Sequence, residues 1–325
     1  MTAAAVVVAD AVSPAVRLHT LLTGWQTDPL SLVALAIEVA LVTWYLVSVR
    51  RLARRGRRWS RRRTVSFLAG SVLVIVAAQS GLASYDDQVF AVHVVQHLLL
   101  MNFAPILLAL GAPVTLALQA SSRRTQRGLL RVLHVGLVEF VTSPVFVVLV
   151  AYGTMVGYFL TPFYALSLRH PWLHDLSHLH FLVSGCLFWW LVVGLDPSRW
   201  RLTHPVKLAI LAVGIPVNAV LGIALTGART SIAAQFHSVA DTHRGGALLW
   251  VVGELTTVVA MAIIVFQWMR AEERRAVRAD RLLDDADDGE RDFAVPWASA
   301  PDPAPAATSA PGGVEAVTTL DHTAR

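Results

Sequence analysis

The chain has one cysteine and one lysine. Because Cys186 stands alone among 325 residues, one chain can form no internal disulfide, no CxxC redox pair and no metal site made of thiolates only. Lys207 is the single lysine, so arginine carries nearly all of the positive charge behind the net charge of +5. The placement of these arginines in the loops is therefore more informative than the total.

Charged residues of both signs are also scarce. They make up 15% of the chain against 55% hydrophobic residues, and the mean hydropathy is +0.57. Soluble domains are typically about one quarter charged. This composition argues against a soluble globular protein. Because the apolar residues fall in long runs, it predicts an all-α integral membrane protein embedded in a lipid bilayer.

Seven of these runs can cross a bilayer, which takes about 20 helical residues. We expect a seven-transmembrane-helix bundle over residues 30–269, with spans at 30–49, 65–84, 88–110, 143–161, 174–195, 205–227 and 245–269. Pro105 and Pro113 should kink or end the third span, because proline removes a backbone donor. Residues 1–29 are expected to be a tail, and residues 270–325 a short helical extension followed by disorder.

The orientation of the bundle follows from its arginines, which favour cytoplasmic loops. Nine arginines lie between Arg50 and Arg63, and further basic groups follow the third, fifth and seventh spans. The N-terminus is therefore expected outside and the C-terminus in the cytoplasm. Residues 122–140 have arginines on one side and leucines on another, a pattern typical of a helix lying in the inner membrane interface.

The histidines point to chemistry, since most of the 12 fall at one side of this topology. The third, fifth and seventh spans all begin, at the expected outer face, with histidines. Two pairs have i,i+4 spacing, His93 with His97 and His174 with His178, which places both rings of each pair on one helix face. His180 and His243 lie nearby, and Met101 continues the first stripe. Imidazoles suit copper, zinc or iron, and a thioether shifts the preference toward Cu(I).

Several carboxylates accompany these histidines. Asp86, Asp87 and Asp241 lie at the outer ends, where they can orient metal-bound imidazoles, although Asp241 equally suits a helix cap. Glu38 and Glu254 fall inside spans, where a charge is costly, so either a proton or cation path or a structural hydrogen bond is expected. The sequence contains no phosphate-binding loop, no nucleophile elbow and no basic aromatic surface for nucleic acid.

Three runs together resemble a known family. FAVHVVQHLLLMNFAPILLALGAP, HLHFLVSGCLFWWLVVGLDP and DTHRGGALLWVVGELTTV are similar, in order and spacing, to the CtaG-type assembly factors of caa3-type cytochrome c oxidase, over roughly Leu30 to Met269. The resemblance implies a non-enzymatic protein of the bacterial plasma membrane that helps to mature a heme-copper oxidase. Oxidase subunits and a copper donor protein are the implied partners, and copper supply is the implied mechanism.

Family motifs fall on particular residues of this chain. The HxxQH element matches His93, Gln96 and His97, and the HxxF element matches His178 and Phe181. The last block falls on Asp241, Gly245, Gly246, Trp250 and Glu254. The chain departs from the family pattern at Val94, where methionine is common, and at His243, where glutamine is common.

The leading hypothesis is an assembly factor that holds Cu(I) at His93, His97 and His178, with Met101, and passes it to the oxidase. Three alternatives remain open. A metal-free scaffold for oxidase subunits fits the sequence equally well. A copper or proton-coupled transporter would use Glu38, Glu254 and Asn218. A membrane redox protein would bind heme through paired histidines.

Overall fold

A computed structural model describes residues 24–293, with side chains to residue 284. All regular secondary structure in this part of the chain is helical. Nearly all of the expected N-terminal tail and the end of the expected C-terminal tail lie outside the described residues. Within them, the boundary between two compact units falls between Trp268 and Met269, and each unit is described by itself.

Six helical segments of the described chain are long and apolar enough to cross a membrane. They are α3 (Pro29–Arg54), α4 (Arg61–Gln79) with α5 (Leu82–Tyr85), the segment Phe90–Ala120, α13 (Pro171–Val193), α14 (His204–Thr226) and α15 (Val239–Phe293). A seventh is added if α11 (Pro144–Leu160) and α12 (Phe163–Arg169), bent by 75° at their junction, form one span. The predicted all-helical architecture is therefore confirmed, with six or seven candidate membrane spans, while the count of seven and the direction of insertion stay predictions.

Proline divides the third predicted span. It consists of α6 (Phe90–Leu98), the π-helical segment η1 (Leu99–Phe103), α7 (Ala104–Leu110) and α8 (Pro113–Ala120). Pro105 stands four residues after Met101 and has no N–H, so it cannot donate the α-helical hydrogen bond to the Met101 carbonyl. The π-helical turn lies at that point. Ala112 then adopts a left-handed backbone, φ 47°, and Pro113 begins α8.

The segment η1 packs closely against α13 at Gly185. A Cβ atom built on Gly185 would clash with the carbonyl oxygen of Met101 and would lie 2.8 Å from its Cα. Only glycine allows the two backbones to approach this closely. This contact determines how closely α13 approaches η1, the segment that follows α6 and His97.

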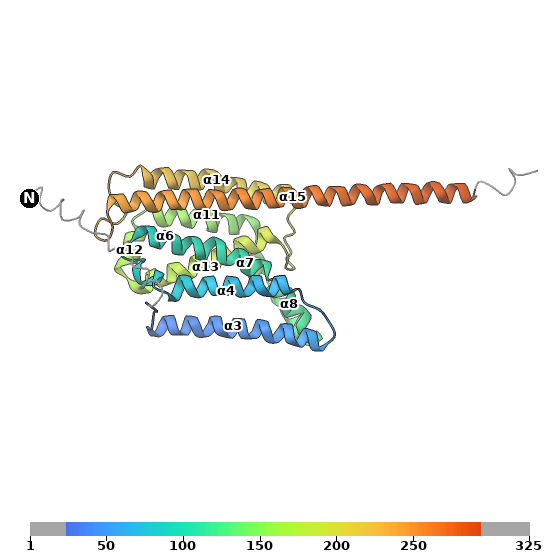
Figure 1. Ribbon diagram of the computed structural model, residues 1–325, viewed down its shortest axis with the longest axis horizontal. Coiled ribbons are helices and arrows are strands. Elements are labelled where there is room, and N and C mark those ends of the chain that lie inside the picture. Colours follow the sequence, from blue (N-terminus) through green and yellow to red (C-terminus); the bar gives the residue numbers. More distant parts are fainter. Residues whose placement is uncertain (1–23, 294–325) are drawn as a thin grey trace, which may run out of the picture. The chain divides into compact units, whose positions relative to one another are not determined.

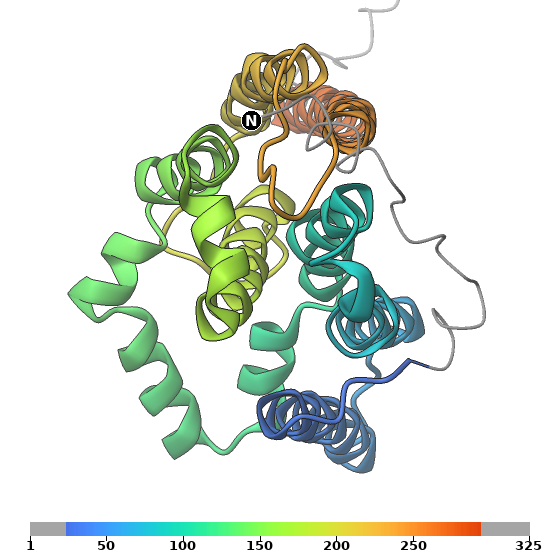
Figure 2. The same ribbon diagram turned by 90° about the vertical axis from the view of Figure 1, so that its left-hand side faces the viewer.

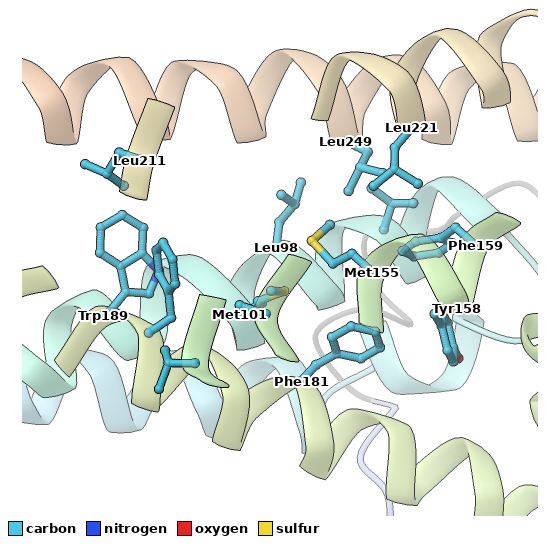
Figure 3. Close-up of a cluster of buried hydrophobic side chains, with 14 of the residues drawn as sticks. Leu98, Met101, Met155, Tyr158, Phe159, Phe181, Trp189, Leu211, Leu221 and Leu249 are labelled. Atoms are coloured by element: carbon cyan, nitrogen blue, oxygen red, sulfur yellow. The ribbon is translucent and has the colours of Figure 1, made fainter. Parts of the chain in front are cut away.

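The helices of the first unit form one bundle around α13 (Figures 1 and 2). α13 contacts η1, α7, α11 and α12, whereas α4 packs on α7, and α3 packs on α4 and α8. Part of α15 lies beside α14 (Figure 1) and also meets α6, because a Cβ on Gly245 would fall 2.6 Å from Cε1 of Phe90. The largest group of buried apolar side chains includes Met101, Met155, Phe181 and Trp189 (Figure 3).

The segment between the third and fourth predicted spans and the segment after the last span are both helical. Residues 122–140, expected as one interfacial helix, form α9 (Arg123–Leu133) and α10 (Gly136–Val141), which are separated near His134. Leu130, Leu137 and Phe140 are exposed on them, as a lipid-facing surface requires. The helical extension expected after the last span is observed, since α15 continues to Phe293.

Candidate metal centre

Three elements position the candidate site at the end of the bundle where α6 and α13 begin. α5 ends at Tyr85, so that Asp86 follows directly, α6 carries His93 and His97, and the first two turns of α13 carry His174 and His178. We call these five residues the imidazole cluster. The i,i+4 spacing of each histidine pair turns both of its rings toward the same neighbour.

The five side chains lie close together. One ligand atom each from Asp86, His93, His174 and His178 lies within 4.8 Å of the others. The centroid of the His97 ring is 4.1 Å from that of His93 and 5.3 Å from that of His178. Nε2 of His174 lies 3.1 Å from the Asp86 carboxylate, and Nε2 of His178 lies 3.6 Å from it. Such separations require only small rotations to place several ligand atoms on one ion.

Most ring nitrogens in the cluster have no hydrogen-bond partner. Both nitrogens of His93 and of His97 are buried and unpaired, as are Nδ1 of His174 and Nε2 of His178. His93 is 0% exposed and His97 is 3% exposed. Leaving a buried polar group unpaired costs about 1–3 kcal/mol, so such groups are rare without a ligand or a functional reason. Because a neutral imidazole keeps one N–H donor and offers one lone pair, a bound cation would use one nitrogen of each ring.

Aromatic rings surround the buried part of the cluster, formed by His93 and His97. The ring of Phe181 lies 4.3 Å from that of His97, and Tyr164 lies 4.8 Å from His93. The hydroxyl group of Tyr158 is 3.0 Å from Ser167 Oγ and 3.1 Å from Ser177 Oγ, so it joins α11, α12 and α13. The side chains of His174 and His178 are 12% and 14% exposed. The cluster is thus open at His174 and His178 and closed at His93 and His97.

The donor set restricts what the cluster can hold. Several imidazoles with one carboxylate suit first-row transition ions such as copper, zinc or iron, whereas calcium and magnesium require mainly oxygen ligands. The hydrogen-bond distance between Asp86 and His174 also lets the carboxylate orient that ring. The residues present therefore fit a copper ion.

A second polar group holds α6 in place from α15. The Asp241 carboxylate accepts hydrogen bonds from the backbone N–H groups of Phe90, at 2.5 Å, and Ala91, at 3.3 Å, so it caps α6 from 150 residues away. His237 lies beside it, with Nδ1 3.8 Å from the Asp241 carboxylate and Nε2 2.7 Å from the Tyr164 hydroxyl. Burial lowers the pKa of His237, although the charge of Asp241 opposes this effect.

The structure brings together five of the residues predicted for the site, namely Asp86, His93, His97, His174 and His178. The sequence predicted that Asp86 would orient a metal-bound imidazole. Its carboxylate instead lies as close to the ring nitrogens as they lie to one another, so it can itself be a metal ligand. Gln96, the glutamine of the HxxQH element, points away from the cluster to α4, because its amide donates to the Ala77 carbonyl at 2.9 Å.

Other predicted site residues lie apart from this group. His180 is exposed, Asp87 is exposed, and Nε2 of His243 lies 2.8 Å from the Ala228 carbonyl. Met101 is buried in the apolar core beyond His97. Glu254 is half-buried on α15, and its Oε2 has no hydrogen-bond partner.

Sequence reasoning missed the aromatic enclosure and the link from His237 to Tyr164. His237 has no signal in the sequence beyond its place shortly before the seventh expected span. No periodicity connects it to α12, because the contact joins residues 73 positions apart. The sequence predicted that Asp241 could cap a helix. The helix that it caps is α6, although Asp241 itself lies in the first turn of α15.

Comparison with known proteins gives one family and several relatives. Residues 43–271 match the family model described as "Cytochrome c oxidase caa3 assembly factor". Uncharacterized proteins of Mycobacterium leprae (strain TN) and Mycobacterium tuberculosis (strain CDC 1551 / Oshkosh) are 33% and 34% identical to the chain over 279 and 282 residues. Each alignment covers 81% of this chain and 42% of the relative, so the chain spans about two fifths of their length. No solved structure matches the chain.

Proposed function

Because the chain belongs to the cytochrome c oxidase caa3 assembly factor family, we propose that it helps to assemble a caa3-type oxidase by holding copper at the imidazole cluster. Copper is the cargo in this proposal, and the oxidase is its destination. The protein itself catalyses no reaction. Its place is the bacterial plasma membrane, with the cluster near the outer leaflet, as the arginine distribution predicts.

One observation carries the proposal: four imidazoles converge with their ring nitrogens largely unpaired inside an apolar bundle. A purely structural role would favour paired nitrogens, because buried polar groups are normally satisfied. A scaffold that only binds oxidase subunits has no use for such a group.

The exposure of the cluster suggests how copper enters and leaves. His174 and His178 are partly exposed, while His93 and His97 are sealed. A donor or acceptor protein can therefore reach the first pair from the end of the bundle. Copper then exchanges by stepwise replacement of ligands, since His178 lies next to both His97 and His174. Cu(I) suits this exchange because it accepts few ligands.

The test replaces the gene by variants in the cell and measures the activity and the copper content of the cytochrome c oxidase. We expect a His93→Ala, His97→Ala double variant to lower cytochrome c oxidase activity and the copper content of the purified oxidase about tenfold under copper limitation. The matched control is His170→Ala, an exposed histidine next to α13, which should behave as wild type.

Two outcomes would contradict the proposal in different ways. If a strain without the gene retains normal oxidase activity under both copper-replete and copper-limited growth, the assembly role is wrong. If deletion abolishes activity but the double variant restores it fully at wild-type copper content, the protein acts as a metal-free scaffold.

A further inference from the structure

A small cavity lies in the core beyond the imidazole cluster. Its volume is about 30 Å³, and it lies between η1, α11, α13, α14 and α15. Two methionines, Met101 and Met155, line it together with Asn102 and Asn218. Figure 3 shows Met101 and Met155 in the buried apolar cluster together with Trp189, which also lines the cavity.

Three of the five polar residues that line this cavity are buried, and the side chain of one of these three has no hydrogen-bond partner. Trp189 is 4% exposed, and its Nε1 donor is buried without a hydrogen-bond partner. Asn218 is 7% exposed. An N–H donor requires an acceptor such as a water or carboxamide oxygen, so the unpaired Trp189 Nε1 shows that the cavity suits a polar occupant but does not itself select a cation. A volume of about 30 Å³ is large enough for a metal ion or for one or two water molecules.

The chemistry of the lining selects among these occupants. The cavity is lined by neither a carboxylate nor an imidazole. Divalent ions favour such harder or charged ligands, whereas thioethers favour Cu(I). Met101 and Met155 are 7% and 8% exposed, so a cation held between them would be shielded from water.

The position of Met101 connects the cavity to the imidazole cluster. It follows His97 by four residues, and the backbone between them passes from α6 into the π-helical segment. Single π-helical turns occur frequently at functional sites. Gly185 holds the Met101 backbone against α13, so the backbone from which this side chain reaches the cavity is held in place.

We propose that this cavity is a second copper site, in which the thioethers of Met101 and Met155 bind Cu(I). The inference rests on the proposed function, because copper is the cargo there. It assigns Met101 to a separate, deeper site than the one formed by the imidazoles. Cu(I) exchanges between the nitrogen ligands of the imidazole cluster, where it enters and leaves, and the sulfur ligands of this cavity on η1 and α11, without any change in oxidation state.

The experiment loads the full-length protein, in detergent, with Cu(I) under anaerobic conditions and desalts it. Copper per chain is then measured together with X-ray absorption at the copper edge. We expect about two copper ions per wild-type chain and both nitrogen and sulfur scattering. A Met101→Leu, Met155→Leu double variant should retain about one ion and lose the sulfur signal. Leucine is close in volume to methionine, so folding should be preserved.

Two further variants make the result specific. Met261→Leu is the matched control, because Met261 packs against the same core without lining the cavity, and it should behave as wild type. A His93→Ala, His97→Ala variant should lose nitrogen-bound copper and keep the sulfur signal. Sulfur-bound copper in a wild-type chain that lacks nitrogen-bound copper would support this site while contradicting the imidazole site.

The proposal is overturned if wild-type protein shows only nitrogen or oxygen scattering. It is equally overturned if the Met101→Leu, Met155→Leu variant, with an unchanged melting temperature, retains as much copper as wild type. Either result would mean that the cavity holds only water.

Discussion

His93 and His97 are the most deeply buried side chains of the imidazole cluster, with 0% and 3% of their surfaces exposed. Their i,i+4 spacing inside an apolar run predicted two imidazoles on one buried face, and both are buried with all four ring nitrogens unpaired. His180 shows the limit of such reasoning. It stands two residues from His178, about 200° around the helix, and is exposed. Proximity in sequence therefore does not place it in the cluster.

Asp241 provides the residue-scale prediction. Its carboxylate caps the first turn of α6, which begins three residues before His93. An Asp241→Ala variant should lose about 0.5–2 kcal/mol of stability, measured as the free energy of unfolding in detergent, because two backbone donors lose their acceptor. Asp241→Asn keeps one acceptor oxygen and should lose less.

The control for this prediction is Asp87→Ala. Asp87 is exposed near the same end of the bundle, so its replacement should change stability by less than about 0.5 kcal/mol. Equal stability of the Asp241→Ala and Asp87→Ala variants would show that the cap contributes nothing.

At the scale of elements, the sequence predicts that the third span is interrupted, but it does not predict the π-helical turn that interrupts it. Pro105 and Pro113 predict that the helix is kinked or ends, since each removes a donor. The π-helical turn at Leu99–Phe103 depends on the neighbouring helix, because η1 fits against Gly185 of α13. An unbroken α-helix would have placed Met101 one turn below His97 on the same face. The tertiary contact that determines its actual place has no signal in the local sequence.

Gly185 provides the element-scale prediction. A Gly185→Ala change places a methyl group against the Met101 backbone, which cannot move without displacing η1. We expect a loss of about 1–3 kcal/mol in the free energy of unfolding, as found for overpacked cores. Weaker copper retention at sulfur should accompany it, because Met101 is displaced.

Gly153→Ala is the matched control for this change. Gly153 lies within α11, and a Cβ atom there would meet nothing within 4 Å. Because alanine favours the helix more than glycine does, this variant should be as stable as wild type or slightly more stable. Gly185→Ala stability equal to that of Gly153→Ala would contradict the close packing of η1 on α13.

For the whole molecule, apolar runs predict the helical architecture and the approximate limits of the candidate spans but not which spans are neighbours. The cluster exists because α13 packs against α7 and η1, which brings its first two turns to His93 and His97. Similarly, α15 reaches α6 only in the folded bundle, where Asp241 meets Phe90 across 151 residues. Such contacts depend on how helices with similar apolar faces pack, and one sequence read alone does not determine that choice.

Locating copper in the copper-loaded protein tests the central claim most directly. An anomalous difference map, recorded at the copper edge from crystals of the full chain loaded with Cu(I), shows the metal positions without reference to activity. We predict a peak among Asp86, His93, His174 and His178, lost when His93 and His97 are replaced by alanine. Copper found elsewhere in the chain, with no density at the imidazole cluster, would contradict the claim.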